Sequence, residues 1–143
     1  MTGAGGPDAD AITRYIIETY PDTVVATAMG ATFFSCDESN WPNFATIVTT
    51  DEHDTGSPSK LSRPGVFRVN IGVSPETFDR IAGAQREPDF TQLDTLMPHP
   101  VYALQQWVCV LNPSETTFET VVKPLLAEAH ERVAAKTQAR RGT

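Results

Sequence analysis

The chain has 143 residues, of which 40% are hydrophobic, and this size is typical of one globular domain that buries about 70% of its unfolded surface. Its formal net charge of -7 disfavours a surface built for nucleic acid or anionic lipid, because both are bound largely through lysine and arginine. Cys36 and Cys109 stand far apart and outside any zinc or redox motif, so we expect two reduced, buried thiols and no metal site.

The two ends of the sequence are expected to lie outside the fold. Residues 1–7 are rich in glycine, and residues 136–143 are basic with nothing apolar to dock, so both are predicted to be flexible, with a single domain over residues 8–135. The N-terminus lacks the basic patch and apolar run of a signal peptide. We therefore expect a cytoplasmic protein without a membrane segment, either a monomer or a homodimer.

The first half of the domain is predicted to form a helix followed by strands. Apolar residues recur at helical spacing over residues 8–20, and an aspartate at the start can cap the helix. Residues 24–28 and 31–35 flank a glycine-containing turn, which indicates a β-hairpin. The β-branched residues of 45–50 indicate a third strand.

The second half contains two strand-to-helix units. Residues 66–73 alternate between apolar and polar side chains, which predicts a strand with one buried face, and Ser74 is placed to cap the helix that follows. Residues 107–111 form the second predicted strand, and Asn112 with Glu115 matches a capping box for the last helix. Strands adjacent in sequence with helices toward the ends indicate one α+β domain, with a mainly antiparallel sheet and helices packed on one face.

His99 is the first candidate for chemistry. It stands between two prolines, which restrict its backbone and present the imidazole from a rigid loop, suited to proton transfer near neutral pH. Tyr102 is the second candidate catalytic residue, as a proton donor or as a group that orients the histidine. The simpler interpretation, which we favour on the residues alone, is a stiff connection in which His99 bonds to the backbone and Tyr102 and Trp107 fill the core.

Polar residues on the predicted strand 66–73 form a candidate ligand-binding set. Arg68 and Asn70 lie on its polar side, and Arg63 precedes the turn that starts it. Arginine forks suit a carboxylate or phosphate of a small anionic ligand, and Trp107 completes the set. The alternative is a half-exposed strand in which Arg68 pairs with a neighbouring acid at little energetic consequence.

Two further groups are interpreted as structural. Residues 51–54 contain three carboxylates and one imidazole, but neighbours in an extended segment point in alternate directions, so we expect a solvated loop and no bound metal. His130 is expected near the end of the last helix, where it favours the C-terminal carbonyls.

Three stretches of the sequence resemble an uncharacterised, mostly actinobacterial family: RPGVFRVNIGV over residues 63–73, MPHPVY over 97–102 and WVCVLNP over 107–113. The likeness covers most of the chain apart from both tails and implies no assigned reaction. More distantly, the order of elements and the loop histidine before a Trp-Val strand are similar to the MmcQ/YjbR family, small α+β proteins for which a DNA-binding role has been suggested. The acidic balance of this chain departs from such a role, because gripping phosphate needs lysines.

Two functional hypotheses follow from the residues. The first is a small-molecule-binding protein or a cofactor-independent acid–base enzyme, with its site near the proline-flanked histidine and the polar side of strand 66–73. The second is a protein-interaction or regulatory domain in which His99 is structural. The sequence leaves open whether any reaction is catalysed, and it indicates no cofactor.

Overall fold

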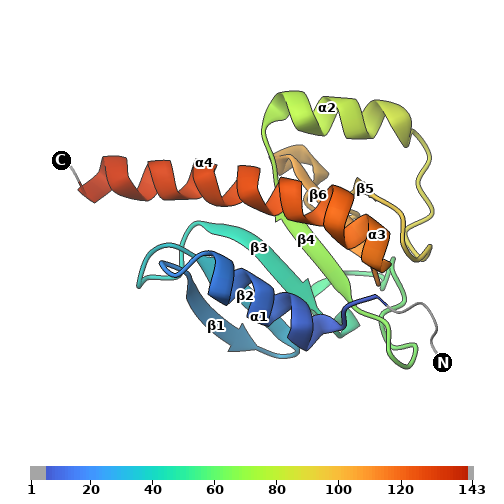
Figure 1. Cartoon of the computed structure of the whole chain (residues 1–143). Coiled ribbons are helices and arrows are strands. Elements are labelled where there is room, and N and C mark those ends of the chain that lie inside the picture. The colour runs from blue at the N-terminus through green and yellow to red at the C-terminus, as the bar shows by residue number, and fades with distance from the viewer. Residues whose placement is uncertain (1–5, 142–143) are drawn as a thin grey trace.

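A computed structural model describes residues 6–141. One sheet has antiparallel neighbours in the order β1-β2-β3-β4-β6-β5, with α1 and α4 lying across one face (Figure 1). This arrangement confirms the predicted α+β fold. The strands are β1 (Val24–Ala28), β2 (Ala31–Ser35), β3 (Asn43–Val48), β4 (Arg68–Gly72), β5 (Met97–Pro98) and β6 (Trp107–Leu111). The α-helices are α1 (Ala9–Thr19), α2 (Pro75–Ala84), α3 (Glu115–Thr117) and α4 (Lys123–Arg141).

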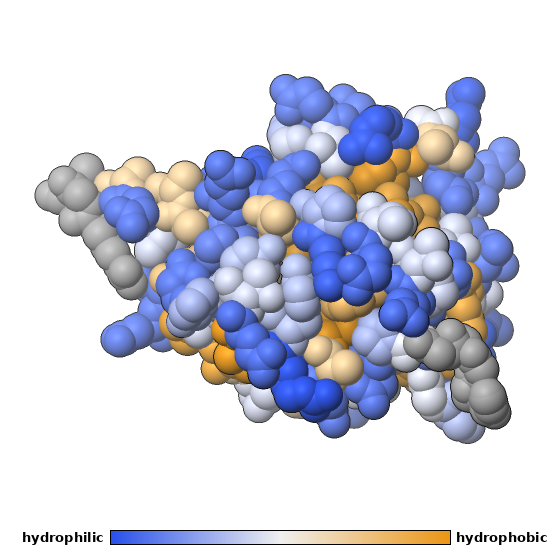
Figure 2. All heavy atoms as spheres, viewed as in Figure 1, coloured by the Kyte–Doolittle hydropathy of each residue, from blue (hydrophilic) through white to orange (hydrophobic). Residues whose placement is uncertain are grey.

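The helix-covered face holds the main apolar core. In α1, the side chain of Asp8 accepts a hydrogen bond from the backbone N–H of Ala11 at 2.8 Å, which caps the helix and confirms the predicted start. Ile12 and Ile16, one turn apart, are fully buried against the sheet. The outer surface on this side is mostly hydrophilic, with apolar residues visible beneath α2 and beside α1 (Figure 2).

Alternation in β4 separates the two faces of the sheet. Val69 and Ile71 belong to the apolar core beneath the helices, so the neighbouring residues Arg68 and Asn70 point to the other face. Asn70 pairs directly with Thr46 of β3 and with Cys109 of β6. A row of polar side chains therefore crosses the middle of the sheet on the face away from the helices.

The start of the last helical segment differs from the predicted capping box. Ser114, not Asn112, is the cap, and its hydroxyl accepts from the backbone N–H of Thr117 at 3.2 Å. Asn112 has a left-handed backbone with φ of 40°, and its side chain joins the end of β6 to the segment before β4 instead: it accepts from Phe67 N–H at 3.0 Å and donates to the Gly65 carbonyl at 2.8 Å. A long-range contact thus replaced the local one that the motif predicts.

The C-terminal helix is longer than the sequence predicts. A π-helical turn, η3 (Phe118–Val122), joins α3 to α4, just before Pro124, which lacks the N–H that a regular α-helical ladder requires. The helix continues to Arg141, and Thr137 is buried, so the stretch from 136 to 141, expected as a flexible tail, is helical. The prediction for residues 1–5 falls outside the described residues. Within the described part of the chain, no helix has the length and apolar character needed to cross a membrane.

Candidate functional site

A buried polar cluster lies on the sheet face away from the helices, and Arg68 is its centre. The arginine is only 1% exposed. Its guanidinium makes a two-pronged ion pair with Asp54, through Nη1 to Oδ2 at 2.7 Å and Nη2 to Oδ1 at 3.2 Å. It also donates from Nη1 to the hydroxyl of Ser59 at 3.0 Å and from Nε to Oδ1 of Asn70 at 2.8 Å. These bonds orient the guanidinium in one plane.

The loop between β3 and β4 carries two of the partners of Arg68, Asp54 and Ser59. Its 3-10 helix, η1 (Asp51–His53), turns the chain so that Asp54 points inward, and Asp54 is 6% exposed. Asn70 extends the network by donating from Nδ2 to the hydroxyl of Thr46 at 2.8 Å. Removing one partner from such a cluster leaves a buried charge without compensation, so its members depend on one another.

His99 closes the other side of the cluster. Its Nδ1 accepts hydrogen bonds from the backbone N–H groups of Val101 and Tyr102, each at 2.9 Å. Its Nε2 lies 3.3 Å from Nη2 of Arg68. Because two backbone donors face Nδ1, we infer that the imidazole proton resides on Nε2. Two N–H donors, one from His99 and one from Arg68, then face each other at the edge of the cluster.

Burial determines the protonation of the two titratable groups that flank Arg68. Burial, together with the smaller effect of the positive charge of Arg68, lowers the pKa of His99 from 6.5 to about 3, so the imidazole is neutral at physiological pH. Burial also raises the pKa of Cys109 to about 12, although Arg68 opposes that rise. Neither group is poised to exchange protons near neutral pH.

A pocket of about 580 Å³ opens over this polar face. Its floor includes Arg68, Asn70 and His99, and its walls contain four larger aromatic side chains. The chain has two tryptophans, and both line this pocket. The aromatic lining consists of Phe33, Trp41, Tyr102 and Trp107.

The charges around the pocket differ in sign from the protein as a whole. Three basic side chains line it, against one carboxylate, Asp54: Arg68 lies on the polar face, and Arg132 and Lys136 reach the pocket from α4 at the end of β4. Arg132 is held in place by donating from Nη1 to the Val73 carbonyl at 3.2 Å. A protein with a formal net charge of -7 thus presents a locally positive cavity.

The structure brings together five of the six residues predicted for the site. His99, Tyr102, Arg68, Asn70 and Trp107 all line the same pocket. The ring of Tyr102 lies 5.1 Å from that of His99, centre to centre, and the tyrosine is half exposed.

Arg63 lies elsewhere. Its guanidinium donates to the carbonyls of Ser59, Lys60 and Thr91 at 2.9–3.0 Å and lines a separate cavity of about 600 Å³. Arg63 holds the loop that carries Ser59, which bonds to Arg68, but Arg63 itself does not line the pocket over the polar face.

Several residues of the site were missed in the sequence. The sequence predicts a solvated loop over residues 51–54, but Asp54 is buried and bonded to Arg68. The residues around Asp54 do not indicate this ion pair, because Arg68 lies on β4, which begins only after an irregular loop. Arg132 and Lys136 stand one helical turn apart, a spacing that indicates a shared helix face, but the composition of residues 136–143 predicts that Lys136 lies in a flexible tail.

Comparison with known proteins identifies one family. No curated protein and no solved structure matched the chain. A family model described as a family of unknown function, DUF6194, matches residues 7–142. This match spans the buried polar cluster, the pocket and every helix and strand described above. The chain therefore belongs to the family of unknown function DUF6194.

Proposed function

We propose that this protein binds a small anionic molecule in the pocket over the polar face of the sheet. The observation that carries the proposal is the excess of basic side chains around a cavity in an acidic protein. Arg68 is already paired with Asp54, which leaves Arg132 and Lys136 as the cations that attract a carboxylate or phosphate.

The shape and lining of the pocket support a ligand with an apolar or planar part. A volume of about 580 Å³ lies within the range of small-molecule sites. Trp41 and Trp107 offer flat apolar surfaces on which such a group can pack. A planar carboxylate, held by its charge near α4 and by its apolar part between aromatic rings, matches both features.

The pocket floor supplies a complementary polar contact. The Nε2–H of His99 and Nη2 of Arg68 are both donors and lie 3.3 Å apart. A ligand oxygen placed against both would accept a hydrogen bond from each. This contact favours a ligand with an acceptor atom at the end that enters the pocket.

Binding is supported better than acid–base catalysis. A general acid or base works best when its pKa lies near the working pH, and the pKa of His99 is lowered to about 3 while that of Cys109 is raised to about 12. The role we assign to His99 is therefore a neutral hydrogen-bond donor. Tyr102, half exposed at the rim, contributes its ring to the wall.

Tryptophan fluorescence tests the proposal directly, because both tryptophans line the pocket. A library of carboxylates and phosphate esters is titrated into the protein, each compound beside its uncharged amide or alcohol. We expect at least one anion to change the tryptophan emission in a saturable way. Its uncharged counterpart should bind at least about tenfold more weakly.

Charge variants locate the binding. Lys136 is exposed at the rim, so Lys136→Glu should fold normally and weaken the anion severalfold. Arg86→Glu makes the same change of charge at an exposed position outside the pocket lining and should leave the affinity unchanged. Equal binding of charged and uncharged partners, or no saturable response to any compound, would contradict an anion site.

One observation favours a second candidate function, a protein-interaction domain. The short 3-10 helix η2 (Ala103–Gln105) projects beside the pocket, and its Leu104 is 89% exposed. Val101 and Tyr102, just before it, are also exposed, and contiguous exposed apolar residues are common at protein contacts. Leu104→Asp should abolish association with a partner under this hypothesis and leave small-molecule binding intact.

A further inference from the structure

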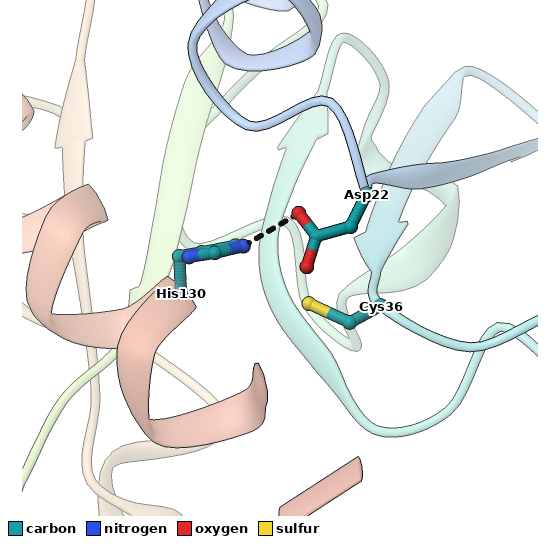
Figure 3. Close-up of side chains that lie close together, drawn as sticks. All are labelled: Asp22, Cys36 and His130. Atoms are coloured by element: carbon teal, nitrogen blue, oxygen red, sulfur yellow. Dashed lines mark hydrogen bonds and ion pairs between the residues drawn. The ribbon is translucent and has the colours of Figure 1, made fainter. Parts of the chain in front are cut away.

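A second cluster of reactive side chains lies on the helix side of the sheet. Asp22 lies in the connection between α1 and β1, Cys36 directly follows β2, and His130 lies on α4. Asp22 and His130 are 108 residues apart in the chain, and Nε2 of His130 lies 2.8 Å from Oδ1 of Asp22. The sulfur of Cys36 lies beside the carboxylate (Figure 3).

The imidazole of His130 is held in a fixed orientation by two aromatic rings. Tyr20 stacks on it with ring centres 4.3 Å apart and planes 23° apart. Phe44 contacts it edge to face at 5.3 Å and 87°. Ring packing of this kind restricts rotation of the side chain, so Nε2 is held toward Asp22 and Cys36.

The donor atoms are placed as a metal ion requires. One carboxylate oxygen, one thiol sulfur and one imidazole nitrogen all lie within 4.8 Å of one another. In a tetrahedral zinc site with bonds of about 2.0–2.3 Å, neighbouring donors lie roughly 3.3–3.7 Å apart. The hydrogen-bonded pair at 2.8 Å would open slightly, and the Cys36 sulfur, which lies within 4.8 Å of both other donors, would complete the site by small side-chain rotations.

We propose that Asp22, Cys36 and His130 bind a Zn²⁺ ion. Thiolate, imidazole and carboxylate together are a donor set that zinc accepts, whereas Ca²⁺ and Mg²⁺ prefer oxygen alone. Binding converts the Cys36 thiol to a thiolate, and its proton passes to solvent. The sequence indicated no metal site because the three ligands come from distant segments without motif spacing.

The geometry favours a metal over a cysteine nucleophile. In a nucleophile–histidine–carboxylate relay, the carboxylate and the nucleophile contact opposite nitrogens of the imidazole. Here the Nε2 end of the ring faces both Asp22 and Cys36 (Figure 3). The three groups converge on one point, which is the arrangement of ligands around an ion.

Solvent supplies the fourth ligand. The side chain of Asp22 is 53% exposed, whereas that of His130 is 18% exposed and Cys36 is buried. Water can therefore reach the ion from the carboxylate side. A site with three protein ligands and one open position is typical of zinc that can exchange its water for another ligand.

Cobalt substitution tests the proposal on the full chain. The protein is freed of metal with a chelator, the chelator is removed, and Co²⁺ is titrated while absorption is recorded. We expect one equivalent to produce a thiolate-to-cobalt charge-transfer band in the near ultraviolet and visible bands of tetrahedral intensity. One equivalent of Zn²⁺ should remove both, because Zn²⁺ replaces Co²⁺ in such sites.

Variants assign the ligands. Cys36→Ser should abolish the charge-transfer band, whereas Cys109→Ser, the matched change at the other cysteine, should retain it. Asp22→Asn lies at an exposed position and should fold normally, and we expect it to weaken Zn²⁺ at least about tenfold by calorimetry, since loss of even an outer-shell partner has such an effect. Absence of the band in the wild type, or its persistence in Cys36→Ser, would overturn the proposal.

Discussion

The two faces of the central sheet are closed by different chemistry. Beneath α1 and α4 the contacts are apolar, with residues such as Val69 and Ile71 fully buried. On the opposite face the same strand buries Arg68 and Asn70, and these are held by an ion pair and side-chain hydrogen bonds. The apolar face gains stability from burial without regard to direction. The polar face requires each partner in place, and in return it forms a shaped, charged pocket.

Breaking the ion pair on the polar face should have the largest effect. Asp54→Leu leaves the guanidinium of Arg68 buried without its carboxylate, so we expect the free energy of unfolding to fall by about 3–5 kcal/mol. The double variant Asp54→Leu/Arg68→Met removes both charges and should cost less than the sum of the single variants. Urea denaturation measures all three. Strictly additive losses would show that the two residues are not coupled.

The second largest effect should be a loss of stability at low pH that arises from His99 on the polar face. Because the pKa of His99 is about 3 in the folded protein against an ordinary 6.5, the unfolded chain takes up the proton first as the pH falls. The stability from the neutral imidazole is therefore complete above pH 6.5 and is lost toward pH 3.

The variant His99→Asn isolates this effect. Asparagine cannot titrate, and its carbonyl can accept from the backbone N–H of Val101 as Nδ1 of the histidine does. Between pH 7 and pH 4.5 we expect the wild type to lose roughly 2–3 kcal/mol more than the variant in urea denaturation. Parallel pH profiles for the two proteins would contradict a neutral, buried imidazole.

A change on the apolar face should be smaller and independent of pH. Ile71→Val removes one buried methylene beneath the helices and should cost about 0.5–1.5 kcal/mol. The loss should add to that of Asp54→Leu within about 0.5 kcal/mol, because the two side chains lie on opposite faces. A larger coupling energy, measured in the same denaturation series, would show that the faces are not separate.

The smallest expected effect comes from a polar contact at the edge of the helix side. Glu128 of α4 accepts from the backbone N–H of Ser74 at 2.8 Å and from the hydroxyl of Thr77 at 3.0 Å, which joins α4 to the start of α2. Glu128→Gln retains one acceptor and should cost about 0.5–1 kcal/mol by thermal or urea denaturation. If Glu128→Gln lowered the free energy of unfolding as much as Asp54→Leu does, polar contacts at the edge of the helix side would matter as much as the buried ion pair, contrary to this prediction.

The faces of β4 could be predicted from sequence, but the contents of the polar face could not. Period-two alternation predicted that Arg68 and Asn70 share a side. It carried no information on the path of the preceding loop, which brings Asp54 back over the strand. Half-exposed and fully buried polar faces have the same alternation, so the pattern could not distinguish a surface arginine from a buried one.

His99 shows the same division. The flanking prolines predict a constrained loop, and the bonds to the backbone N–H groups of Val101 and Tyr102 agree with the part of the simpler interpretation that concerns His99. The other part is wrong for Tyr102, which is half exposed at the pocket and does not fill the core. Its proximity to the guanidinium of Arg68 depends on the pairing of β5 with β6, and two residues make too short a strand to predict. The shift in pKa follows from that tertiary burial and has no local signature.

The helical layer is built from both ends of the chain. Tyr15 of α1 packs edge to face on Phe118 with ring centres 5.3 Å apart, and Asp22 meets His130 across 108 residues. During synthesis, the apolar face of the sheet therefore has no complete cover until the segment from 115 to 141 has left the ribosome. Folding of this domain must be completed late, and a nascent chain stalled before that segment would present an open sheet to chaperones.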